Sequence, residues 1–340
     1  MIILNNSPRL DLDKETNIYM HILNVKTKEI TKNTEDIQLK NGYYFIICNP
    51  WELKFLKSQI NINKETYKDC LAFDEKTKVN TFDEYVFFTL NNFQIGEENI
   101  LLEEINILFS DKFVILVLRK RNEIYNKAKE LMRDNFFYKS DYTLSLLIIY
   151  STILRIIIFD QFEQLDRVEE RIMELEDEII NDVNDIVSNK INHIRGICRS
   201  CVKNIRPLTY MMDTLLKDGM EFLSNGPQDS YLEKEYLKLL QGLDNSIDKL
   251  YNFSLNTREL ADKLLDIYSS EVSEKTNNLI NKLTILTGTA VPISIITGIY
   301  GMNFNYMPEL TYVYGYKITI LIIISILVIS FIIFRRKKFL

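Results

Sequence analysis

Apolar residues follow two different periods along the chain, and the change of period divides it. Before about residue 135 they occur in short runs that include a period of two, bounded by turn residues, at Gly42–Asn49, Glu84–Phe93, Ile105–Phe109 and Phe113–Leu118. This period of two predicts strands, and Ser110-Asp111-Lys112 predicts a hairpin turn between the last two. Pro50–Gln59 and Lys64–Ala72 have helical patterns. Residues 1–135 are therefore expected to form a small α/β domain.

From about residue 140 onward, apolar residues recur every three or four positions, which predicts helices. Tyr142–Leu154 is uncharged but too short to span a bilayer, so we expect a buried helix there. Ile157–Val187 and Arg195–Leu223 are predicted as further helices, the second with a break or kink at Pro207. Residues 224–229, which contain Gly and Pro, predict a turn.

A third helix is expected to be unusually long, because no Gly or Pro occurs from Leu243 through Thr287. Its 45 residues would extend roughly 68 Å. A seam with a 3-4-3-4 spacing and a polar middle runs along it: Leu240, Leu243, Ile247, Leu250, Ser254, Thr257, Ala261, Leu264 and Tyr268. Such a helix can carry a mechanical signal to a pore or serve as a coiled-coil anchor, and spacing does not separate the two.

Two apolar runs near the C-terminus predict membrane spans, at about 283–302 and 317–334. The alternative is a pair of buried core helices, which the second run disfavours because it has no polar face. Arg335-Arg336-Lys337-Lys338 follows the second run, whereas Gly301–Tyr316 carries one charge. The positive-inside rule therefore places both termini in the cytoplasm. The absence of a signal-peptide pattern agrees with this orientation.

Composition excludes several classes of protein. A mean hydropathy of −0.08 over 340 residues excludes a polytopic bundle, and 46% hydrophobic residues exclude disorder. The net charge of −6 argues against a nucleic-acid partner. Cys198 and Cys201, with His193 nearby, have no second cysteine pair, so we interpret them as packing residues rather than a zinc site. The acidic stretch Glu163–Asp185 is interpreted as a solvated face.

The first span differs from a plain anchor because one stripe along it starts and ends with small or polar residues and has apolar residues within it. The stripe contains Asn277, Ile280, Thr284, Thr287, Val291, Ser294, Gly298 and Gly301. It can line a pore with hydrophobic constrictions, or it can mediate tight helix packing. Two spans cannot enclose an ion path, so a pore requires several identical chains around an axis.

The segment Tyr300-Gly301-Met302-Asn303-Phe304, followed by Met307-Pro308-Glu309-Leu310, resembles the signature of CorA-type magnesium channels. The resemblance is close over residues 266–340 and extends to the rest only in layout. It implies a funnel-shaped homopentamer with an α+β cytoplasmic domain (1–135), a helical domain with a long stalk helix (136–282) and a two-helix transmembrane hairpin (283–340).

The resemblance also implies the site residues of a magnesium pathway. Gly301, Met302 and Asn303 would form the selectivity filter, with a ring of Asn303 amide oxygens that accept hydrogen bonds from hydrated Mg²⁺. Glu309 would attract external cations. The expected pore and gate residues are Asn277, Ile280, Leu283, Thr287, Val291 and Ser294, with Ile280, Leu283 and Val291 as the hydrophobic gate.

Intracellular Mg²⁺ regulates this family, and the matching positions here are Asp69 and Asp266. A stalk carboxylate that relatives often carry further upstream falls on Gly242, and Asp244 is its nearest substitute. Carboxylates suit Mg²⁺ as hard oxygen ligands. Mg²⁺ is thus expected as both cargo and regulator. No P-loop pattern occurs, and we expect neither an enzymatic activity nor an organic cofactor.

The function implied is passive uptake of Mg²⁺, with Co²⁺ and Ni²⁺ as further cargo, through a bacterial plasma (inner) membrane. The membrane potential would supply about 4–5 kcal/mol for a divalent ion at 100 mV. Two alternatives remain open: a transporter of the same family for zinc or another divalent ion, including efflux, and a non-conducting coiled-coil membrane scaffold. Divalent ions, the lipid bilayer and further copies of the chain are the expected partners.

Overall fold

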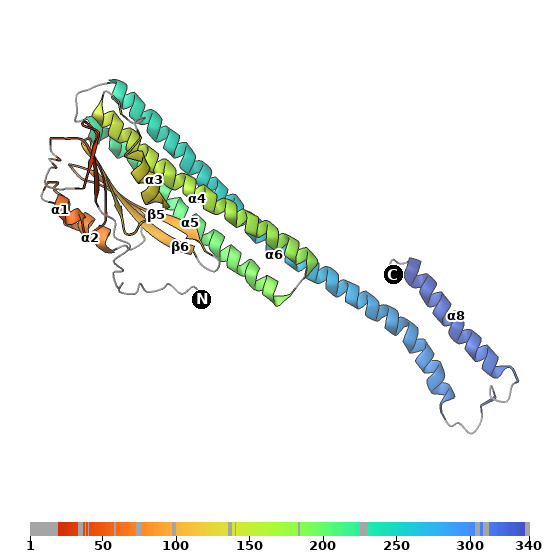
Figure 1. Cartoon of the computed structure of the whole chain (residues 1–340). Helices are drawn as coiled ribbons and strands as arrows, with labels where there is room; N and C mark the ends of the chain where they lie inside the picture. Colours follow the sequence, from red (N-terminus) through yellow and green to blue (C-terminus); the bar gives the residue numbers. More distant parts are fainter. Residues whose placement is uncertain are drawn as a thin grey trace. The chain divides into compact units, whose positions relative to one another are not determined.

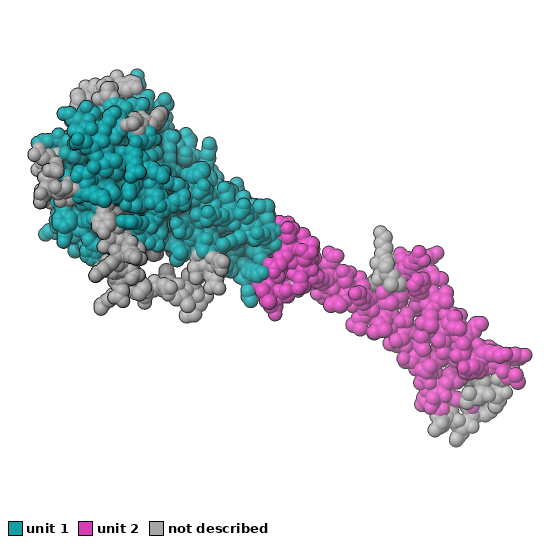
Figure 2. All heavy atoms as spheres, viewed as in Figure 1, with its two compact units in different colours: residues 1–175, 189–264 teal, residues 176–188, 265–340 magenta. Residues whose placement is uncertain are grey.

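The computed structural model describes residues 20–32, 37, 39, 41–57, 59–72, 77–96, 100–134, 138–139, 141–182, 184–224, 230–302, 307–308 and 313–336 (Figure 1). The chain divides into two compact units (Figure 2). Unit 1 comprises Met1–Leu175 and Asn189–Leu264, and unit 2 comprises Glu176–Ser188 and Leu265–Leu340. The three-part division expected from the sequence, at 135 and 282, stays a prediction.

A seven-stranded sheet organises the first part of unit 1. Its strands lie in the order β2-β1-β3-β7-β6-β5-β4. All neighbouring pairs are antiparallel except β3 and β7, which are parallel. The strands are β1 His21–Asn24, β2 Glu29–Thr31, β3 Tyr44–Cys48, β4 Lys78–Thr81, β5 Val86–Ile95, β6 Ile100–Phe109 and β7 Phe113–Leu118.

The predicted hairpin between β6 and β7 is confirmed. The two strands pair antiparallel, and Ser110 N–H donates to the Phe113 carbonyl at 2.8 Å across the turn. The four strands expected from the short apolar runs are all present; β7 has the expected ends, and the ends of the other three differ by a few residues. The short strands β1, β2 and β4 were not predicted, because each is too brief to display a period.

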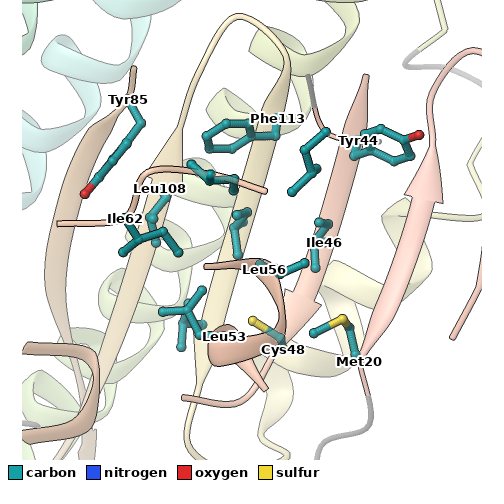
Figure 3. Close-up of a cluster of buried hydrophobic side chains, with 14 of the residues drawn as sticks. Met20, Tyr44, Ile46, Cys48, Leu53, Leu56, Ile62, Tyr85, Leu108 and Phe113 are labelled. Atoms are coloured by element: carbon teal, nitrogen blue, oxygen red, sulfur yellow. The ribbon is translucent and has the colours of Figure 1, made fainter. Parts of the chain in front are cut away.

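One face of the sheet is covered by two short helices, α1 (Leu53–Leu56) and α2 (Lys64–Ala72) (Figure 3). Leu53 and Leu56 of α1 are fully buried and pack over Ile46 and Cys48 of β3. Successive strand residues point to opposite faces, so alternate positions of β3 and β7 belong to this core. This packing confirms the expected α/β arrangement of the first domain.

The opposite face packs against α4 (Tyr142–Asn181). Tyr150 of α4 is fully buried, and its ring stacks on Phe109 with centroids 4.5 Å apart and meets Phe88 at 5.6 Å. Aromatic pairs of this kind contribute about 0.5–1.5 kcal/mol beyond the burial of area. Although α4 is long and apolar enough to cross a membrane, 61% of its apolar window is buried inside the fold. The prediction of a buried helix at 142–154 is confirmed.

The sequence pattern predicted shorter helical segments than the structure contains. The single helix α4 continues through Arg155, where the apolar run is interrupted, and ends at Asn181 rather than Val187. The next helix, α5, spans Asp185–Ser224 and continues through Pro207, so Pro207 does not break the helix, and a kink there stays a prediction. The turn predicted at 224–229 falls almost wholly outside the described residues.

The long helix α6 spans Ser230–Tyr300, 71 residues, and confirms the prediction of an uninterrupted helix. Its 3-4-3-4 seam is covered within a single chain: every seam residue from Leu240 through Leu264 is at most 1% exposed. Thr257 Oγ1 lies 3.3 Å from Glu169 Oε1 of α4, and Arg195 Nε of α5 donates to Asp262 Oδ1 at 2.7 Å. The seam therefore holds α6 to its own neighbouring helices.

In unit 2, α8 (Gly315–Arg336) approaches the C-terminal part of α6 at Gly288. A Cβ atom added to Gly288 of α6 would lie 3.0 Å from Phe334 Cζ of α8. The absent side chain thus permits the close approach of the Phe334 ring. Nearer the start of this unit, Tyr268 Oη donates to the Asn184 carbonyl at 3.3 Å.

Candidate ion pathway and metal-binding residues

The residues predicted to line a pore lie on the C-terminal part of α6, and all are exposed in the single chain. Ile280, Leu283 and Val291 are 55%, 59% and 52% exposed. Asn277, Thr287 and Ser294 are exposed as well. Such apolar exposure is unfavourable in water, so this face needs a bilayer or other protein to cover it. Whether these residues face a pore stays a prediction.

The threonine hydroxyls of this segment hydrogen-bond to their own helix. Thr284 Oγ1 donates to the Ile280 carbonyl at 2.8 Å, and Thr287 Oγ1 donates to the Leu283 carbonyl at 2.9 Å. Thr297 Oγ1 donates in the same way to the Ile293 carbonyl at 3.1 Å. The donors are therefore satisfied without a neighbouring helix, and the oxygens keep lone pairs for a cation or water.

Helical hydrogen bonding continues just beyond the end of α6. Gly301 N–H donates to the Thr297 carbonyl at 2.9 Å, and Met302 N–H donates to the Ile299 carbonyl at 3.2 Å. Gly301 and Met302 are exposed. The other two residues predicted for the outer mouth, Asn303 and Glu309, lie outside the described residues.

The two predicted regulatory carboxylates differ in their surroundings. Asp69, on α2, pairs with Lys78 at the start of β4, with Nζ 2.8 Å from Oδ2 and both side chains 25% exposed. Asp266, on α6, is exposed. Asp69 belongs to unit 1 and Asp266 to unit 2. Their action as ligands of one ion stays a prediction.

Asp244, the substitute considered for the upstream carboxylate, is half-buried on α6. Burial raises the pKa of its carboxyl group, and the neighbouring carboxylates Asp248 and Asp213 raise it further. A cation near Asp244 would relieve this repulsion. An acidic group of this kind is also common without a metal, so Asp244 remains a secondary candidate.

The cysteines have the properties of packing residues. Cys198 is 1% exposed and Cys201 is fully buried, and burial raises the pKa of both thiols to about 12. Without a bound metal, both thiols are therefore protonated at neutral pH. His193 is exposed, whereas His21 is buried with Nε2 3.0 Å from Tyr125 Oη. These observations favour the packing interpretation over a zinc site.

One group of carboxylates was missed by the sequence reasoning: Glu123, Asp160 and Glu163 lie together in unit 1. Asp160 and Glu163 are three residues apart on α4, so a helical pattern places them on one face. Glu123 begins α3 (Glu123–Leu131), far away in sequence. Only the packing of α3 beside α4 brings it to them, and no local signal predicts that.

Unit 2 carries the features of a membrane-embedded hairpin. Both of its apolar helical windows, in α6 and α8, are long enough to cross a bilayer and 0% buried. Leu286 is 63% exposed and Leu321 66%. By contrast, the apolar window of α4 is mostly buried in unit 1. The fold thus defines a membrane protein whose first and larger unit is a folded α/β and helical body.

Comparison with known proteins identifies the family. Residues 41–336 match the family model described as CorA-like Mg2+ transporter protein, and the chain belongs to this family. It is a family of transporters and channels rather than of enzymes. The chain is 26% identical over 279 residues to the cobalt/magnesium transport protein CorA of Thermotoga maritima, covering 80% of this chain and 75% of that protein.

Two further comparisons extend the likeness over nearly the whole chain. The putative metal ion transporter YfjQ of Bacillus subtilis is 22% identical, with 84% of this chain and 85% of that protein covered. The complete structure of the CorA magnesium transporter from Methanocaldococcus jannaschii aligns with a TM-score of 0.74 at 19% identity, covering 95% of this chain and 99% of that one. This structural match confirms the expected α/β domain, long helix and C-terminal helix, whereas the funnel-shaped homo-oligomer stays a prediction.

Proposed function

We propose that this chain forms a passive channel for Mg²⁺, open also to Co²⁺ and Ni²⁺, in a bacterial plasma (inner) membrane. The observation that carries the proposal is α6, one continuous helix from the buried seam of unit 1 to the exposed apolar segment that ends at Tyr300. Gly301-Met302-Asn303 follows it directly. Similarity to a cobalt/magnesium transport protein supports the choice of cargo.

The conducting form is a homopentamer. Two membrane helices in each chain cannot enclose an ion path, so several chains must surround one axis. Exposed apolar side chains such as Leu283 and Val291 support this assembly, because neighbouring chains and lipid would cover them. The number five comes from the resemblance of the signature segment to CorA-type channels.

The ion path runs along the exposed stripe of α6. Ile280, Leu283 and Val291 form hydrophobic constrictions, which close a pore by excluding water. Asn277, Thr287 and Ser294 supply oxygen atoms between and beside them. A hydrated divalent ion passes only when the constrictions widen, so the spacing of the α6 helices controls conduction.

Selection occurs at the outer mouth. Amide oxygens of Asn303 from each chain accept hydrogen bonds from the water shell of Mg²⁺, which dehydrates reluctantly. Gly301 and Met302, which directly precede Asn303 in the sequence, complete this filter. Glu309 raises the local concentration of cations through its negative charge.

Asp69 and Asp266 act as regulatory ligands for intracellular Mg²⁺ between neighbouring chains. Asp266 precedes Leu283 by 17 positions, about 25 Å along α6. An ion that bridges two chains at this level holds the helices together and keeps the constrictions narrow. Loss of the ion leaves like charges close together, so the helices separate and the channel opens.

The orientation follows from the basic tail. Arg335 and Arg336 close α8, and positive residues favour the cytoplasmic side. With two membrane passes, we expect the N-terminal unit in the cytoplasm too. Entry of Mg²⁺ is driven by the membrane potential, which supplies about 2.3 kcal/mol per charge per 100 mV.

Flux from the purified chain in liposomes tests the proposal. With an inside-negative potential, Mg²⁺ should enter and Asn303→Ala should abolish entry while the pentamer still assembles. Asn305→Ala, the same change two positions away, is the matched control and should conduct normally. Mg²⁺ uptake by Asn303→Ala at the wild-type rate would refute the filter assignment.

The same liposomes separate the alternatives. Flux of Zn²⁺ without Mg²⁺ flux would indicate a zinc transporter of this family. Absence of flux for Mg²⁺, Co²⁺ and Zn²⁺ from correctly assembled protein would indicate the non-conducting scaffold. Reversing the sign of the potential should reverse net Mg²⁺ movement if transport is passive.

A further inference from the structure

Three carboxylates of unit 1 lie close together in space. In the sequence they are distant from the proposed pore and regulatory residues. Glu123 at the start of α3 and Asp160 and Glu163 on α4 each offer one oxygen, and these oxygens all lie within 4.8 Å of one another. We propose that these three side chains, together with Asn92 of β5, bind one divalent cation within each chain.

The charges of the described side chains support a divalent ion. Three carboxylates face one ammonium group, that of Lys127, whose Nζ lies 2.7 Å from Glu123 Oε1. The cluster therefore retains two uncompensated negative charges when all three carboxylates are ionised. Asp160 is only 3% exposed, so water compensates its charge poorly. A single divalent cation balances the cluster.

Asn92 provides an independent indication of a ligand. Its side chain is 1% exposed, and Nδ2 donates to Asp160 Oδ2 at 2.6 Å. The other terminal atom of this carboxamide, Oδ1, is buried and has no hydrogen-bond partner among the residues that the structure describes. Buried polar atoms are normally satisfied, so an orphaned acceptor beside a carboxylate cluster calls for a cation or its water.

The geometry of Asn92 suggests how it would respond to an ion. Rotation of the carboxamide by half a turn exchanges Nδ2 and Oδ1, which have nearly the same size. Oδ1 then lies where Nδ2 now meets Asp160, and it changes from an unsatisfied acceptor into a cation ligand. In the absence of the ion, the donor Nδ2 faces the carboxylate instead. Asn92 can thus face the cluster with either its donor or its acceptor.

The donor set selects the class of ion. All the donors are carboxylate or amide oxygens, which prefer hard cations such as Mg²⁺ and Mn²⁺ over the softer ions that sulfur ligands favour. The bound ion joins the start of α3 to α4 and to β5. We expect it to stabilise unit 1 rather than to conduct or gate, and its presence does not depend on the proposed channel function.

Mn²⁺ binding to the full-length chain in detergent micelles tests this site. Equilibrium dialysis should show one fewer Mn²⁺ per chain, or at least a tenfold weaker affinity for one ion, in Glu123→Gln/Glu163→Gln than in the unmodified protein. Glu170→Gln, an exposed change on α4, is the matched control and should bind as the unmodified protein does. Ions bound at other sites contribute equally to every variant, so they do not affect the difference between variants.

A second variant keeps the test decisive if the double variant folds poorly. Asn92→Asp replaces the orphaned amide oxygen by a charged ligand, and it should tighten binding of one Mn²⁺ by at least threefold. Circular dichroism establishes that each variant is folded. Equal stoichiometry and affinity for the unmodified protein, Glu163→Gln and Asn92→Asp would overturn the proposal.

Discussion

Lys78 Nζ lies 2.8 Å from Asp69 Oδ2, so the carboxylate proposed as a regulatory Mg²⁺ ligand already has a cation beside it. The two residues belong to β4 and α2, and each side chain is 25% exposed. A divalent ion that binds Asp69 must compete with this ammonium group. The ion pair therefore bears directly on the Mg²⁺ concentration at which the proposed channel closes.

Removing the ammonium group of Lys78 should make the channel more sensitive to inhibition by internal Mg²⁺. A partly exposed ion pair contributes about 0.2–1 kcal/mol, so Lys78→Gln should lower the half-inhibitory Mg²⁺ concentration about 1.5- to 5-fold. Lys78→Arg keeps the charge and is the control. Flux measured against internal Mg²⁺ gives both values. An unaltered or higher inhibitory concentration in Lys78→Gln would argue against competition at Asp69.

Loss of Asp266 should weaken inhibition without changing selectivity. A ligand shifts a conformational equilibrium only through its different affinity for the two states, and Asp266→Ala removes part of that difference. We expect inhibition by internal Mg²⁺ to require a higher concentration, while Mg²⁺ is still preferred over Na⁺. Glu271→Ala, on the same helix, is the control. If Asp69→Ala/Asp266→Ala keeps the normal inhibition curve, the sensor lies elsewhere, with Asp244 the first residue to test.

The close approach of α8 to Gly288 predicts a steric effect. A Cβ there would meet Phe334 Cζ at 3.0 Å, so Gly288→Val should destabilise the hairpin by about 1–3 kcal/mol through overpacking. The double variant Gly288→Val/Phe334→Ala has a smaller side chain at position 334, so it should regain part of the lost stability. A Cβ at Gly298 meets no atom of the described residues within 4 Å, which makes Gly298→Val the matched control. Thermal unfolding in micelles measures all four chains, and equal midpoints for both valine variants would contradict the contact.

Buried thiols should be inert in the folded chain. All four cysteines are free and buried, and burial raises the pKa of Cys198 and Cys201 to about 12. Because the thiolate is the reactive form, a maleimide at pH 7.5 should label almost none of them until denaturant is added. Cys198→Ser/Cys201→Ser should also leave Zn²⁺ binding unchanged. Rapid labelling of the native protein would show that these sites open.

Acid should destabilise the fold partly through His21. Its burial, together with the positive charges of Lys129, Lys32, Arg121 and Arg133, lowers the pKa of the imidazole. As the pH drops below about 6.5, the unfolded chain binds a proton at His21 and the folded chain does not. The free energy of unfolding therefore falls. His21→Gln should flatten this part of the curve, whereas His193→Gln should not. Denaturant titrations between pH 8 and 5 compare them, and parallel curves for unmodified and His21→Gln protein would exclude this contribution.

The sequence alone determined the features that depend on local chemistry. The absence of Gly and Pro predicted the uninterrupted helix that α6 forms, and the apolar runs predicted the two exposed helices of unit 2, because hydropathy and backbone freedom are properties of neighbouring residues. The segment around Gly301-Met302-Asn303 indicated the family that residues 41–336 match.

Tertiary structure decided what depends on residues distant in the chain. The parallel pairing of β3 with β7, the burial of Tyr150 against Phe109 and the contact of Lys78 with Asp69 have no local signal. The same holds for Glu123, which reaches Asp160 only because α3 packs beside α4. Such contacts form when separate elements bury their apolar faces together, and no period along the sequence records which polar side chains then meet.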